Sequence, residues 1–121
     1  MLITRLGDCP EFLAGDHTRL RELLHPTKSG ARIGYSLAWG TIEPGQRSKR
    51  HRLASAEVYY FLAGRGSFQI DQEAAIVEAG TVVYVPPGGA QWVENTGTTR
   101  LEFLCLVDPP WRVQDEEILE D

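Results

Sequence analysis

Apolar and polar residues alternate along much of this chain after residue 30. Ile33, Tyr35, Leu37 and Trp39 are separated by single small or polar residues, which is the period-two pattern of a strand with one buried face. Six further short strand candidates follow, at Val58–Leu62, Ser67–Ile70, Ala74–Val77, Thr81–Val85, Gln91–Glu94 and Leu101–Val107. Turn residues separate them at intervals of about 8 to 12 residues. This pattern indicates an all-β sandwich or small barrel.

One segment near the N-terminus has a different period and predicts a short helix over Asp16–His25. Leu20, Leu23 and Leu24 recur at helical spacing, and the aspartate at the start can accept hydrogen bonds from the first free backbone amides. Pro26 ends this predicted helix, because proline lacks the amide proton that the next turn needs. We therefore expect one short N-terminal helix beside the β domain.

The negative charge is concentrated at the C-terminal end of the chain. The 121 residues carry a net charge of −5, and five of the 17 acidic side chains lie in the last seven residues, at Asp115, Glu116, Glu117, Glu120 and Asp121. Such a run is typical of a solvated end. We expect one domain over 1–112, including an N-terminal arm, followed by an acidic C-terminal tail over 113–121.

Composition and charge exclude several classes of protein. A chain of 121 residues with 42% hydrophobic residues can bury one core without cross-links. No apolar run approaches the roughly 18 residues that span a membrane, and the N-terminus lacks the features of a signal peptide, so we expect a cytoplasmic protein with no membrane partner. The one basic cluster, Arg47–Arg52, is too short to follow a phosphate backbone. No nucleic-acid partner is expected.

Two sets of residues occur at spacings that are more specific than the strand pattern. The first set is Gly45, His51, Glu57 and Gly64, and the second set is Gly80, Pro86, Gly88 and Asn95. These spacings resemble the two sequence motifs of the cupin family, which usually read G-x5-H-x-H-x3,4-E-x6-G and G-x5-P-x-G-x2-H-x3-N. Leu53 stands at the second histidine of the first motif, and Gln91 stands at the histidine of the second. The resemblance implies a double-stranded β-helix, which is the cupin form of the jelly roll.

In cupins, the motif histidines and glutamate point into the barrel and hold one metal ion. Carried over to this chain, the resemblance implies a metal site of His51, Glu57 and Gln91. An imidazole nitrogen, a carboxylate oxygen and an amide oxygen can hold Zn, Mn, Fe, Co or Ni, although Leu53 leaves the site one donor short of the family pattern. We therefore expect a divalent metal in the barrel and oxygenase-type or isomerase-type chemistry on a small polar organic molecule.

A metal-free barrel is the alternative. His51 and Glu57 would then hydrogen-bond each other, Gln91 would satisfy the remaining polar atoms, and a His–Glu pair can move a proton. That arrangement favours an acid–base isomerase or epimerase, or a non-catalytic protein that binds a small metabolite. Tyr59 is a third candidate catalytic residue, because strand alternation places it on the same side as Glu57 and places Tyr60 on the other side.

The positions of two tryptophans predict the oligomeric state. Trp92 is adjacent to Gln91 in a predicted strand and faces the other side of the sheet, while Trp111 follows the Asp108–Pro110 break. Tryptophan is favoured in the cores of interfaces, and cupins of this size commonly dimerise through sheet packing. We expect a homodimer in which these two side chains cover a sheet of the partner.

Overall fold

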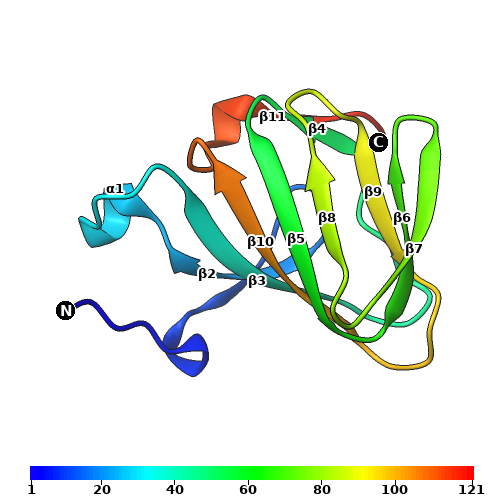
Figure 1. Ribbon diagram of the computed structural model, residues 1–121, viewed down its shortest axis with the longest axis horizontal. Coiled ribbons are helices and arrows are strands. Elements are labelled where there is room, and N and C mark those ends of the chain that lie inside the picture. The colour runs from blue at the N-terminus through cyan, green and yellow to red at the C-terminus, as the bar shows by residue number, and fades with distance from the viewer.

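The computed structural model describes residues 1–121 and consists of two antiparallel sheets (Figure 1). The six-stranded sheet has the order β1 (Glu11–Leu13), β2 (Arg19–Leu24), β3 (Ser36–Ile42), β10 (Leu101–Asp108), β5 (Ala56–Ala63) and β8 (Val82–Val85). The five-stranded sheet has the order β11 (Glu116–Ile118), β4 (His51–Leu53), β9 (Gln91–Asn95), β6 (Arg65–Ile70) and β7 (Glu73–Glu78). From β4 to β11 the chain changes sheet at nearly every connection. The predicted all-β class is confirmed.

The core lies between the two sheets and fills one end of the barrel. In β10, every second residue from Leu101 to Val107 is buried, as the alternation predicts. An aromatic cluster forms the centre of this core, with ring centroids 4.9 Å apart for Tyr59 and Phe68 and 5.5 Å apart for Phe61 and Phe103. Aromatic rings supply much of the buried apolar area in small cores. The packed cluster reaches as far as Tyr59 along β5, and the remaining end of the barrel holds a cavity.

The prediction of a helix over Asp16–His25 is wrong. Residues 19–24 form strand β2, which pairs with both β1 and β3, and the only α-helix is the single turn α1 (Pro26–Ser29). Pro26 begins this helix rather than ending one, because proline is well suited to the first helical position. No helix of the chain is long and apolar enough to cross a membrane.

The acidic C-terminal segment is not a solvated tail. Val113–Asp115 form a 3-10 turn, η2, and the next three residues form β11, which pairs with β4 so that Ile118 lies opposite His51. Its acidic side chains pair with the basic segment before and within β4: Glu120 accepts from Arg47 at 2.8 Å and from the Arg50 backbone N–H at 2.8 Å. The acidic and basic clusters therefore neutralise each other across the sheet edge.

Both tryptophans that predicted a dimer have partners within their own chain. The guanidinium of Arg47 lies 4.8 Å from the ring centroid of Trp92, and the indole N–H of Trp111 donates to Glu116 at 2.9 Å. Trp92 does face away from Gln91, which is buried while Trp92 is only partly buried. The homodimer stays a prediction.

Gly64, between β5 and β6, is expected to be one of the least replaceable residues of the fold. Its φ is +87°, and a Cβ there would stand 2.7 Å from the carbonyl oxygen of Arg100. Gly80 has a similar φ of +90° but has no atom within 4 Å of the same position. Urea unfolding should therefore show a loss of roughly 3 kcal/mol or more for Gly64→Ala and about 1 kcal/mol for Gly80→Ala. Equal losses would show that the steric contact is relieved without penalty.

Candidate functional site

A cavity of about 440 Å³ occupies the end of the barrel that the aromatic core leaves open. Its walls come from both sheets, from the β1–β2 turn and from the C-terminal segment. Most of the wall is apolar, and the main apolar contributors are Phe12, Leu13, Leu20, Leu37, Val107 and Trp111. Four titratable side chains form a polar region in the same cavity: Asp16, His51, Glu57 and Glu116. This volume and this mixture are typical of sites for small organic molecules.

His51 is placed in the cavity by the alternation of β4, in which residues 51 and 53 are buried and residue 52 is exposed. Its Nδ1 lies 2.7 Å from the carbonyl oxygen of Lys49. A carbonyl oxygen only accepts, so Nδ1 carries a hydrogen and donates it to Lys49. The Nε2 atom lies 3.5 Å from Oδ2 of Asp16. His51 is therefore held in place by its Nδ1–H, with Nε2 directed toward the Asp16 carboxylate.

Asp16 reaches this region because the β1–β2 turn folds against the segment before β4. The backbone carbonyl of Asp16 accepts from the N–H of Lys49 at 2.6 Å, and its Oδ1 accepts from the N–H of Thr18 at 3.0 Å. The residue is only 7% exposed. Two hydrogen bonds therefore hold a buried carboxylate next to the His51 ring, on an element that lies outside both sequence motifs.

Glu57, Gln91 and Tyr59 form a buried chain of hydrogen bonds. The Tyr59 hydroxyl donates to Oε1 of Gln91 at 2.8 Å, and Nε2 of Gln91 donates to Oε1 of Glu57 at 2.8 Å. Glu57 lines the cavity, whereas Gln91 and Tyr59 are not among its lining residues. Gln91 is nevertheless close to His51, since the two residues are paired across β4 and β9. Of the four predicted site residues, His51 and Glu57 line the cavity. Gln91 and Tyr59 lie behind them, and their hydrogen bonds hold Glu57 in place.

The environment changes the acidity of the buried groups. Burial raises the pKa of Glu57 to about 7, against the opposing influences of His51 and of the hydrogen bond from Gln91. Burial and the neighbouring Glu57 carboxylate raise the pKa of Tyr59 well above its ordinary value. Burial also raises the pKa of Glu116, although the hydrogen bond from Trp111 opposes this. A carboxyl group with a pKa near 7 is poised to exchange protons under neutral conditions.

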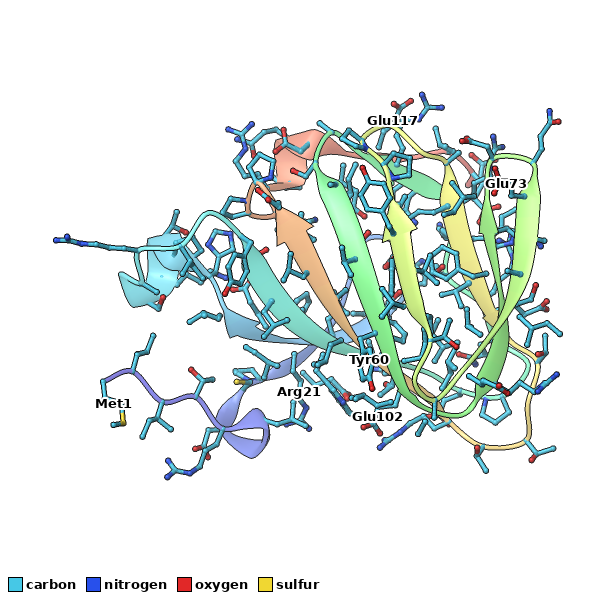
Figure 2. All side chains as sticks on the ribbon, in the orientation of Figure 1. Met1, Arg21, Tyr60, Glu73, Glu102 and Glu117 are labelled. Carbon is cyan, nitrogen blue, oxygen red and sulfur yellow. The ribbon has the colours of Figure 1, made fainter.

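Tyr59 and Tyr60 lie on opposite sides of β5. Tyr59 is buried, and Tyr60, labelled in Figure 2, is 43% exposed. The Tyr59 hydroxyl is directed to Gln91 instead of the cavity. In this arrangement Tyr59 positions the Gln91–Glu57 pair, and its role as a catalytic residue stays a prediction.

Sequence reasoning missed Asp16 and Glu116 as site residues. Asp16 was interpreted as the cap of a helix, yet Gly15 and Asp16 between two short apolar runs also fit a turn, which is what they form. Glu116 belongs to the acidic segment expected to be solvated, and no local pattern distinguishes it from its neighbours. Both residues reach the cavity through tertiary contacts alone.

The predicted metal-ligand set does not fit a metal ion in this arrangement. The amide of Gln91 is engaged at both ends, and the group that it presents to Glu57 is its NH2, which cannot coordinate a cation. Leu53 lines the cavity and offers no donor atom. No group of three His, Cys, Asp or Glu side chains in the chain is arranged to hold a metal ion. A divalent metal held by His51, Glu57 and Gln91 stays a prediction.

Comparison with known proteins gives a consistent picture. The family model described as "Cupin domain" matches residues 38–107. An uncharacterized protein of Methanocaldococcus jannaschii, MJ1618, is 36% identical over 110 residues, covering 90% of this chain and 87% of that protein. A Thermotoga maritima protein named as oxalate-binding is 39% identical over 67 residues, covering 54% of this chain and 55% of its own length.

The fold has clear counterparts among solved structures. The crystal structure of a predicted oxalate decarboxylase from Thermotoga maritima superimposes with a TM-score of 0.78, covering 89% of this chain and 99% of the other. Sequence identity in that superposition is 23%. At this identity the likeness establishes the barrel architecture and leaves the chemistry of the cavity to be argued from its own side chains.

Proposed function

This chain belongs to the cupin domain family, and we propose that it binds a small organic molecule directly, through the polar region of its cavity and without a bridging metal ion. One observation carries the proposal. Tyr59 and Glu57 hold the amide of Gln91 at both ends, so a hydrogen-bonded chain stands where the family resemblance implies a metal ligand. His51 and Glu57 remain as the motif residues that line the cavity and can contact a bound molecule.

A second candidate function, acid–base isomerisation or epimerisation, is favoured by the presence of His51 and Glu57 in one cavity. His51 is held through Nδ1 with its Nε2 directed toward the Asp16 carboxylate in the cavity, and burial raises the pKa of Glu57 to about 7. Proton transfer is most effective when the pKa of the transferring group lies near the working pH. His51 would remove a proton from the bound molecule and Glu57 would return one to it, after which both groups regain their starting states by exchange with water.

The proposal is tested by the melting temperature of the full chain in a buffer that contains a chelator. Four small molecules serve as probes: 3-phenylpropylamine, 3-phenylpropan-1-ol, 3-phenylpropanoate and oxalate. A molecule present at about ten times its dissociation constant should raise the melting temperature by about 4 °C. We expect such a shift for at least one of the probes with an apolar body, because most of the cavity wall is apolar.

A cavity-filling variant provides the control. Ala38 lines the cavity and lies opposite the buried Cys105 in the β3–β10 pairing, so Ala38→Phe places a ring in the space of the bound molecule. Ala74→Phe, on the exposed face of β7, adds the same ring elsewhere. The shift should vanish in the first variant and persist in the second. The proposal fails if no probe shifts the wild type in chelator, or if shifts appear only after a divalent metal is added.

A further inference from the structure

The cavity is lined by more carboxylates than positively charged groups. Asp16, Glu57 and Glu116 face one imidazole, that of His51. Asp16 and His51 both influence the acidity of Glu57 and of Glu116, which shows that the four groups act on one another. The remaining charged lining residues, Glu22 and Lys28, neutralise each other in a pair at 2.7 Å. The polar region therefore carries a net negative charge.

Two carboxylates of this region can accept hydrogen bonds from a bound molecule. Glu57 accepts from Gln91 through Oε1 and lines the cavity, where its carboxylate can receive a further donor. Oδ2 of Asp16 lies 3.5 Å from His51 Nε2, which is a long contact that leaves this oxygen able to accept from another donor. A molecule that brings hydrogen-bond donors and positive charge into the cavity would satisfy both carboxylates.

No arginine and no unpaired lysine lines the cavity. Carboxylates are usually bound by arginine side chains, which donate two parallel hydrogen bonds, yet no arginine is among the lining residues and the only lysine is already paired. An oxalate dianion would meet three carboxylates at close range, and like charges in a partly desolvated site repel strongly. The cavity is therefore unsuited to a dicarboxylate, although several of the similar proteins carry oxalate in their names.

The apolar walls of the cavity favour an organic cation over a bare metal ion. Most of the lining is apolar, with Phe12, Leu13 and Leu20 among its residues, and the Trp111 ring lies beside Glu116. A metal ion would leave this surface in contact with water, whereas an aliphatic or aromatic body would cover it. An indole face also attracts an adjacent ammonium group.

We propose that the cavity selects a small amine, with its ammonium group among Asp16, Glu57 and Glu116 and its apolar body against the opposite walls. This inference rests on the proposed function, because it names the class of molecule that the same cavity binds. Asp16 is the main specificity-determining residue, since it contributes a buried carboxylate from a turn outside the cupin motifs.

Calorimetric titration of the full chain with the same four probes tests this inference at about pH 8 in chelator. 3-Phenylpropylamine should bind at least about tenfold more tightly than the equally long neutral alcohol, because charge-assisted hydrogen bonds to carboxylates are stronger than neutral ones. 3-Phenylpropanoate and oxalate should show no detectable binding. Asp16→Asn keeps the acceptor for the Thr18 N–H and should lower the affinity for the amine about tenfold while leaving the affinity for the alcohol unchanged.

Glu73→Gln is the matched control, because it removes one carboxylate from an exposed position. Figure 2 shows Glu73 and Met1 at opposite ends of the long axis of the molecule. This variant should bind the amine as the wild type does. Equal affinities for amine and alcohol, or tighter binding of the carboxylates, would overturn the inference while leaving the proposed function intact. Binding of none of the probes would overturn both, and so would a melting shift produced by manganese chloride alone.

Discussion

Glu57→Gln is expected to stabilise the free protein by roughly 3 kcal/mol at pH 8 and to leave its stability unchanged near pH 4. The pKa of Glu57 in the folded chain is about 7, against an ordinary value of 4.5. The folded state therefore binds more protons than the unfolded state between these two values, and the stability of the wild type falls as pH rises through that window. Glutamine retains the acceptor for Gln91 but has no charge to bury, so the variant lacks this dependence.

Chemical unfolding of both proteins at intervals from pH 4 to pH 8 measures this effect as a difference between the two curves. Other acidic groups contribute equally to both curves and cancel. Glu73→Gln removes an exposed carboxylate and should follow the wild type throughout. A constant difference across the pH range would mean that Glu57 does not ionise at an unusual pH, and the account of its burial would then be wrong. The variant should also lose affinity for the amine, because it removes one of the carboxylates that surround the ammonium group.

The double variant Leu53→His/Gln91→His is expected to bind a divalent metal on the order of 100-fold more tightly than the wild type. Both positions are buried next to His51, one on the same face of β4 and the other opposite it on β9. The two substitutions restore the two histidines of the cupin motifs and replace an amide that is held by other hydrogen bonds. Imidazole is a stronger neutral donor for Zn and Mn than an amide oxygen.

Competition with a fluorescent chelator measures this gain without reference to any activity. Arg52→His/Trp92→His provides a control, because it places the same two side chains one residue away, where both positions face outward. That variant should bind metal no better than the wild type. Wild-type affinity equal to that of the inward-facing variant would show that His51, Glu57 and Gln91 suffice as ligands. Gln91 would then have to release its hydrogen bonds on binding the metal.

The parts of the fold that the sequence predicted are those in which local pattern and tertiary structure agree. In β10 the inward positions from Leu101 to Val107 alternate without interruption, so the period is visible in the sequence. In β2 the pairing with β3 shifts between Glu22 and Leu24. A bulge of this kind adds a residue and breaks the period of two. The leucines of this strand then fall at helical spacing, which explains why the segment was interpreted as a helix.

The residues of the candidate site also fall into two groups, those that could be identified from the sequence and those that could not. His51 and Glu57 belong to the motif with fixed spacing and could be identified from it, and they line the cavity. Asp16 and Glu116 reach the cavity from segments at the two ends of the chain, held by contacts such as the Lys49–Asp16 backbone hydrogen bond and the β4–β11 pairing. A single sequence contains no local signal for contacts of this range. The acidic character of the cavity was therefore not predictable.

The central claim is that the barrel binds its organic molecule through its own side chains. It is tested most directly by titrating 3-phenylpropylamine into two samples of the wild-type chain, one dialysed against chelator and one then reloaded with Mn or Zn ions. The account predicts the same dissociation constant in both samples, because Asp16 and Glu57 supply the contacts. Binding in the reloaded sample alone would contradict it.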